Sequence, residues 1–123
     1  MFNDFEPEID YGKNSYGPSL QELRIANYTR QQLWDTKNEL TLAFRGNELA
    51  GEVGEACNII KKLERERLGI KGSRATEIEL ADELADVIIC VDLICMHLNI
   101  NLAKAVADKF NATSDKMGFE VKL

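Results

Sequence analysis

Two pairs of acidic residues could do chemistry together. Glu52 and Glu55 form the first pair, and Glu83 and Asp86 form the second. On a helix, residues three apart lie on one face, one turn apart. Clustered carboxylates repel one another, so they raise one another's pKa or bind a cation. Oxygen ligands select a hard ion, and we expect Mg²⁺, with Mn²⁺ or Ca²⁺ as alternatives. Mg²⁺ held by carboxylates, water and substrate phosphate is typical of nucleotide sites.

A di-iron carboxylate site is the main chemical alternative for these acids. Such sites use Glu-x-x-His motifs on their helices, and His97 is the single histidine of the chain. It lies about 21 Å along the helix from Glu83 at 1.5 Å per residue, so iron is disfavoured. A lone E-x-x-E pair is usually a solvated helix face. Two such pairs, each beside an apolar stripe on neighbouring helices, are harder to explain in that way.

Two predicted helices begin in the first half of the chain. The first begins at Ser19, which opens a capping box, and its apolar stripe extends to Leu40. The second runs from Gly46 or Asn47 to about Arg67 and carries the first acidic pair. Residues 1–18 contain both prolines and little periodicity, so we expect an arm there and one domain over residues 19–123.

Two further helices are predicted after a glycine-containing turn. The third opens at Thr76, carries the second acidic pair and ends at His97 or Leu98. It is apolar around most of its circumference, which favours burial against a partner subunit. The fourth follows the N-cap Asn101. The predicted fold class is therefore an all-α, four-helix bundle, in which antiparallel packing of the second and third helices would bring the four carboxylates to one edge.

The sequence around these acids resembles a known family. The segment ELAGEVGEA, residues 48–56, looks like the first acidic motif of the MazG-like all-α nucleoside triphosphate pyrophosphatases. The segment DELADVII, residues 82–89, resembles the second, and the spacer between the motifs has a length that the family accommodates. The less specific stretch KFNATSDK, residues 109–116, is similar to a segment that helps to hold the triphosphate. The resemblance covers roughly Leu33 to Met117.

This resemblance implies a Mg²⁺-dependent hydrolase with a MazG-like fold. Its reaction would be attack of water between the α and β phosphates of a ribo- or deoxyribonucleoside triphosphate, giving a nucleoside monophosphate and pyrophosphate. Glu52, Glu55, Glu83 and Asp86 would be the metal ligands, and Glu52 or Glu55 would also take the proton of the attacking water. Relatives are dimers or tetramers with sites at subunit contacts, so we expect a homodimer or homotetramer.

The expected substrate-binding residues carry a positive charge, an aromatic ring or an amide. They are Lys61, Lys62, Lys109, Asn111, Lys116, Trp34, Phe44 and Asn47. The lysines would neutralise phosphates as point charges. Asn111 lies where relatives carry a late asparagine or arginine. Trp34 and Phe44 would stack on the base unless they are core residues, and Asn47 would read a base edge unless it serves only as an N-cap.

The composition of the chain disfavours some classes of binding partner and some cellular compartments. The net charge is −6, with 21 acidic and 15 basic residues and no basic block, which disfavours nucleic acids and anionic membranes. The three cysteines form no CxxC pair, and the N-terminus lacks an apolar signal segment, so we expect reduced thiols in a cytoplasmic protein. Two alternatives stay open: hydrolysis of another pyrophosphate nucleotide such as an alarmone, and a non-catalytic helical oligomerisation module.

Overall fold

The described part of the chain is entirely helical. The computed structural model describes residues 17–123, and over these residues it contains no strand, as predicted. The predicted arm lies outside the described residues except for its last two positions. The helices are α1 (Leu20–Trp34), α2 (Leu42–Arg67), α3 (Glu77–His97) and α4 (Leu102–Met117).

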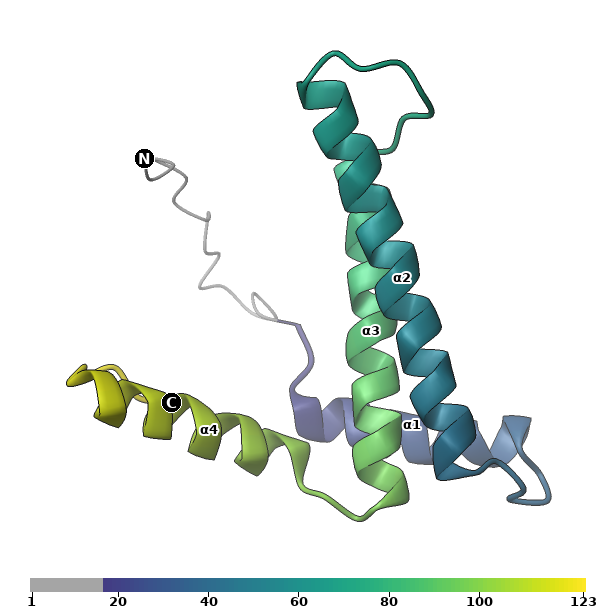
Figure 1. Cartoon of the computed structure of the whole chain (residues 1–123). Coiled ribbons are helices and arrows are strands. Elements are labelled where there is room, and N and C mark those ends of the chain that lie inside the picture. The colour runs from purple at the N-terminus through teal and green to yellow at the C-terminus, as the bar shows by residue number, and fades with distance from the viewer. Residues whose placement is uncertain (1–16) are drawn as a thin grey trace.

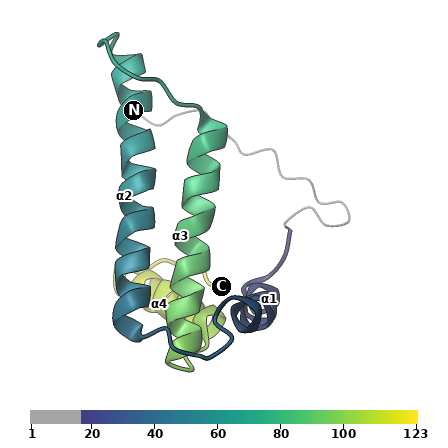
Figure 2. The same ribbon diagram turned by 90° about the vertical axis from the view of Figure 1, so that its right-hand side faces the viewer.

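The two longest helices form an antiparallel pair, α2 and α3, as expected from their short connection (Figure 1). α1 lies across the end of this pair at which α2 begins and α3 finishes, and it packs on α3 (Figure 2). α4 leaves from the same end and projects away, with only a small contact to α1. The four predicted helices are present, but within one protomer they do not close into a four-helix bundle.

Side-chain caps set where the helices start. Ser19 forms the predicted capping box with Glu22, and the Asn101 side chain accepts the N–H of Lys104 at 3.0 Å, which confirms both predicted starts. The prediction that α2 starts at residue 46 or 47 is wrong. Thr41 is the N-cap, and its hydroxyl accepts the N–H of Phe44 at 3.1 Å.

α1 also ends earlier than its apolar stripe suggested. The helix stops at Trp34, and the stripe's last member, Leu40, belongs to the loop. The Asp35 carboxylate accepts the backbone N–H groups of Glu39 and Leu40 at 2.9 and 2.8 Å. These backbone hydrogen bonds hold the pKa of Asp35 below its usual value. A carboxylate that binds the backbone in this way favours a turn over a further helical turn.

A polar network holds α1 against α3. Asp92 on α3 is fully buried and accepts hydrogen bonds from Arg24 Nε and Asn27 Nδ2, each at 2.9 Å. The Arg24 guanidinium also donates to the carbonyl of Ile100 at 2.7 Å, beyond the end of α3. Because the buried carboxylate has partners for both oxygens, its burial is compensated. The network fixes how α1 crosses the helix pair.

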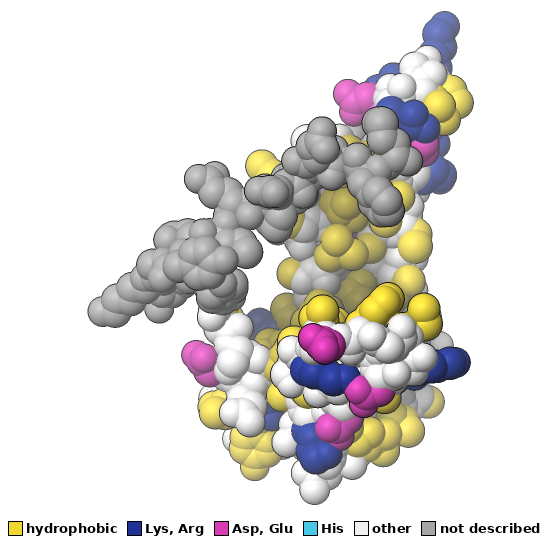
Figure 3. Space-filling model, turned by 90° about the vertical axis from the view of Figure 1, so that its left-hand side faces the viewer, with side chains coloured by type: hydrophobic (Ala, Val, Ile, Leu, Met, Phe, Trp, Pro, Cys, Tyr) yellow, Lys and Arg dark blue, Asp and Glu magenta, His cyan; other side chains and the backbone are white. Residues whose placement is uncertain are grey.

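The apolar core of a single protomer is small. Among the described residues, the buried hydrophobic ones are Ala56, Ala75, Cys90 and Leu93. Large apolar side chains are exposed on every helix, and Figure 3 shows hydrophobic side chains gathered along the α2–α3 pair above α4. Within residues 17–123, no helix has the length and apolar character needed to cross a membrane.

Candidate functional site

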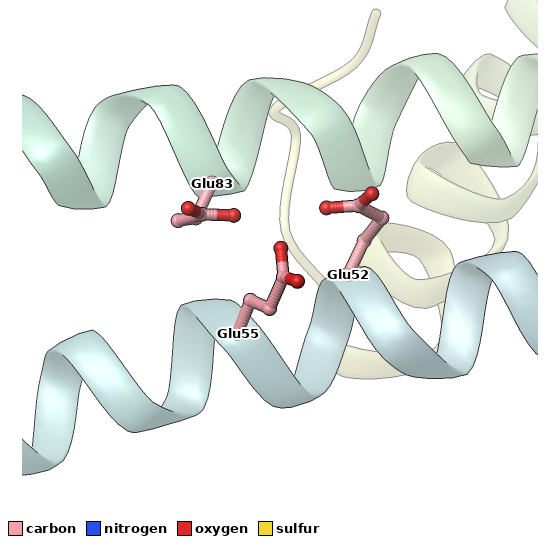
Figure 4. A group of neighbouring side chains, drawn as sticks. All are labelled: Glu52, Glu55 and Glu83. Carbon is pink, nitrogen blue, oxygen red and sulfur yellow. The ribbon is translucent and has the colours of Figure 1, made fainter.

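Three of the predicted metal ligands lie together between α2 and α3. Glu52, Glu55 and Glu83 each offer a carboxylate oxygen, and these oxygens all lie within 4.8 Å of one another. Two of the side chains come from α2 and one from α3, and they point toward one another across the helix contact (Figure 4). The antiparallel packing expected from the sequence therefore brings the two acidic motifs together.

Two oxygens of this cluster are buried without a partner. Glu52 Oε2 and Glu83 Oε2 are shielded from solvent, and no described residue donates a hydrogen bond to either. A buried anionic oxygen without a donor is costly, and a bound cation would compensate it. The all-carboxylate donor set and these two orphaned oxygens therefore fit a hard divalent cation such as Mg²⁺.

The pKa values of the cluster reflect the same crowding. Burial, followed by the neighbouring charge of Glu55, raises the pKa of Glu52. For Glu83, the adjacent Glu55 carboxyl group is the main cause of the raised pKa, and burial is the next. The same crowding makes these carboxyl groups harder to ionise, and a bound cation would offset the repulsion between them.

Asp86, the fourth predicted ligand, lies beside the cluster of three. Its charge contributes to the raised pKa values of both Glu52 and Glu83. It also lines a cavity together with Glu52. It is not one of the carboxylates whose oxygens gather within 4.8 Å. The four predicted ligands are therefore neighbours, with Asp86 on the side that faces the cavity.

A cavity of about 420 Å³ opens next to the acids, between α1, α2 and α3. Glu52 and Asp86 line it, and so do Trp34 and Phe44, the two rings predicted to stack on a base. Trp34 is 77% exposed and Phe44 is 45% exposed, so neither ring is a core residue of the described chain. The cavity has a volume typical of small-molecule sites and an apolar wall with a few polar groups.

One wall of the cavity carries a charged network that the sequence analysis missed. Arg45 is 5% exposed, donates to Glu48 Oε1 at 2.8 Å and also donates to Gln31 Oε1. Beside them, burial and the charge of Glu48 raise the pKa of the Cys90 thiol to about 11. The i,i+3 spacing of Arg45 and Glu48 could have predicted their ion pair. The contact of Arg45 with Gln31 on α1 depends on the tertiary fold, so the sequence pattern could not predict it.

The remaining predicted substrate residues do not line this cavity within one protomer. Lys61 and Lys62 follow Glu55 on α2 by about 9 and 10.5 Å at 1.5 Å per residue. Lys109 and Lys116 lie on α4, which does not pack on α2. Asn111 instead exchanges hydrogen bonds with the backbone of Leu123, at 2.8 and 3.2 Å.

Asn47 is the other expectation that the structure does not support. It is exposed and lies inside α2, so it is not an N-cap, and it is not among the residues that line the cavity. Comparison of the chain with protein-family models and with curated protein sequences gives no match.

Proposed function

We propose that the chain is a Mg²⁺-dependent nucleoside triphosphate pyrophosphohydrolase. The observation that carries the proposal is the convergence of three carboxylates from two helices, with two buried orphaned oxygens, at the edge of a nucleotide-sized cavity. The resemblance of both acidic segments to the MazG-like motifs supports the choice of a triphosphate. The acid cluster and the cavity would also suit other ligands that carry both a phosphate group and an aromatic ring.

In this proposal, the acids hold the metal ion and act on the attacking water, and the aromatic rings hold the base. Glu52, Glu55, Glu83 and Asp86 would hold Mg²⁺, which would supply positive charge to offset that of the phosphates. Glu55 is the most exposed of the three clustered acids, and it or Glu52 takes the proton of the attacking water. Water then bonds to phosphorus as the bond between the α and β phosphates breaks. Trp34 and Phe44 hold the base away from the acids.

We also propose a homodimer or homotetramer in a cytoplasmic setting. The thin core and the many exposed apolar side chains support association, because a lone protomer leaves too much apolar surface in water. In an oligomer, α4 of a second copy could bring Lys109 and Lys116 to the phosphates, which α4 of the same copy does not do. The three cysteines are free thiols, which suits a reducing compartment.

Pyrophosphate release tests the proposal. Wild-type protein and Glu55→Gln would be given a panel of ribo- and deoxyribonucleoside triphosphates, with Mg²⁺ and with EDTA. We expect Mg²⁺-dependent release by the wild type and at least a hundredfold loss in the variant, about the contribution of a general base. Glu66→Gln, an exposed acid near the end of the same helix, is the matched control and should retain activity.

The alternatives predict different outcomes in this assay. Metal binding without release from any triphosphate would move the assignment to another pyrophosphate nucleotide, such as an alarmone. Neither release nor a Mg²⁺-dependent rise in melting temperature would leave the helical oligomerisation module, which the exposed apolar surface also suits.

A further inference from the structure

Arg30 on α1 lines the cavity and has no charged partner among the described residues. The residue is exposed, and its guanidinium carbon lies 5.3 Å from the centroid of the Trp34 ring, which is a cation–π contact. Trp34 lies one helical turn further along α1 and lines the same cavity. The ring therefore holds the guanidinium at the cavity wall, while its charge stays available to a ligand.

The other cation of the cavity lining is already paired. Arg45 is 5% exposed and forms an ion pair with Glu48 at 2.8 Å, and it also donates to Gln31. Its charge is therefore neutralised within the wall. Among the described residues that line the cavity, Arg30 is the cation whose charge no ion pair offsets.

The acids beside the cavity call for such a charge if a phosphorylated ligand is to bind. Four ionised carboxylates carry twice the charge that one Mg²⁺ neutralises, and the phosphates add more negative charge to the site. Glu52 and Asp86 line the cavity, so their charge acts on any ligand inside it. Lys109 and Lys116 do not line the cavity of their own protomer. Arg30 is thus the cation of the same protomer that is placed to offset this repulsion.

We infer that Arg30 binds the phosphate chain of the nucleotide. A guanidinium is a planar fork of N–H donors that matches the oxygens of a phosphate group. Because Arg30, Glu52 and Asp86 line one cavity of about 420 Å³, a single nucleotide can contact the arginine and the acids together. The inference rests on the proposed function and adds a substrate-binding residue that the sequence analysis did not include.

Binding of nucleotides that cannot be cleaved tests this role. The α,β-methylene analogues of ATP, GTP, CTP and UTP would be titrated into the full chain with Mg²⁺, and the nucleoside of the best binder would be titrated in parallel. Trp34 is the single tryptophan of the chain, so quenching of its fluorescence reports binding in the cavity. We expect the analogue to bind about tenfold or more tightly than its nucleoside, because its phosphates add charged contacts.

Arg30→Gln should weaken binding of the analogue about tenfold and change binding of the nucleoside less than about twofold. The variant loses one charged hydrogen bond to phosphate, which is worth about that much. Added salt should weaken analogue binding more in the wild type than in the variant, because salt screens the contact that the variant lacks. Arg30→Lys keeps the charge without the planar fork and should retain part of the affinity.

Arg67→Gln is the charge-matched control. Arg67 is an exposed arginine of α2 that does not line the cavity, so this variant should bind the analogue as the wild type does. Equal losses of analogue and nucleoside affinity in Arg30→Gln would show that Arg30 only supports the Trp34 ring, and would overturn the inference. An unchanged affinity for the analogue, or no binding of any of the four analogues, would also overturn it.

The assays of binding and of cleavage separate the two proposals. Arg30-dependent binding of an analogue without pyrophosphate release from the triphosphates would uphold the role of Arg30 and reject the pyrophosphohydrolase. Pyrophosphate release with the same KM in the wild type and in Arg30→Gln would do the reverse.

Discussion

At the scale of single residues, the main feature of the site is the repulsion between neighbouring carboxylates on α2 and α3. Glu52 and Glu83 each have a buried oxygen without a donor, and both have raised pKa values. Such an arrangement lowers stability unless something offsets it. Function explains its presence better than stability does, because a packed helix pair without a ligand has no need of it.

Glu83→Gln should separate the effect of charge repulsion on stability from the effect of metal binding. Without metal at pH 7, removing one negative charge relieves repulsion, so we expect the melting temperature to equal or exceed that of the wild type. Saturating Mg²⁺ should raise the melting temperature of the wild type and have little effect on the variant. Glu79→Gln, an exposed position on the same helix, should respond to Mg²⁺ as the wild type does. A variant that loses stability in EDTA but retains its Mg²⁺ response would contradict the metal site.

The pH dependence has a definite sign. A carboxyl group with a raised pKa in the folded state destabilises the fold when ionised, and this penalty disappears as the pH falls through that pKa. In EDTA, the wild type should therefore gain stability relative to Glu83→Gln as the pH falls from the raised pKa values of Glu52 and Glu83 to 4.5, the ordinary value of a glutamate. Urea unfolding at several pH values measures the difference. A constant difference across that window would show that the cluster is not strained by charge.

At the scale of elements, α1 depends on one buried carboxylate. Asp92 accepts from Arg24 and Asn27, and these contacts place α1 so that its side chains close one side of the cavity. The apolar contribution to this packing is modest, since the exposed face of α1 includes Ile25 and Leu33. The position of α1 is thus determined more by polar contacts than by a core.

Asp92→Asn should destabilise the protein by about 2–3 kcal/mol. The amide cannot satisfy both donors, although Arg24 is 25% exposed and can be partly hydrated, which limits the cost. Urea unfolding measures this change. Asp108→Asn, which breaks the exposed pair with Lys104 on α4, should change stability by less than about 0.5 kcal/mol. Equal effects of the two substitutions would contradict the role of Asp92.

The elements were largely predictable because their signals are local. The caps Ser19 and Asn101 and the end of α3 follow from short-range side-chain chemistry. The start of α2 was misplaced because Gly46 and Asn47 are weak helix formers that here lie inside a long helix. Thr41 offered an equally good N-cap signal.

The site was predictable only in part, for a related reason. The i,i+3 acids and the two rings could be recognised from spacing and residue type; three of the acids lie together, and the rings line the cavity beside them. Arg45 could not be recognised as part of the cavity wall, because its contacts with Gln31 and Glu48 join α1 to α2. The lysines of α4 could not be placed, since nothing local in the sequence fixes the direction in which α4 leaves α3.

At the scale of the whole molecule, the exposed apolar surface points to association. α4 carries exposed Val106, Phe110 and Met117, and among the described helices it makes only a small contact with α1. A helix with an uncovered apolar face is unstable in water, so a partner should cover it. The helices would then complete a closed bundle only in the oligomer, with helices from more than one protomer.

Light scattering coupled to gel filtration tests this expectation. The 13.9 kDa chain should have an apparent mass two or four times larger at micromolar concentration. Phe110→Glu should lower the mass and the melting temperature together, because it places a charge in the proposed contact. Asp108→Asn serves as the exposed control on the same helix. A wild type that is monomeric and stable at all concentrations would contradict this expectation.

The most direct test of the central claim is to identify the products by ³¹P NMR. Wild-type protein would be incubated with Mg²⁺ and the triphosphate that it binds best, and the phosphorus signals would be followed with time. We predict that the triphosphate signals give way to those of a nucleoside monophosphate and pyrophosphate, and that EDTA prevents the change. A diphosphate with orthophosphate, or an unchanged triphosphate in the presence of Mg²⁺, would contradict the proposed cleavage between the α and β phosphates.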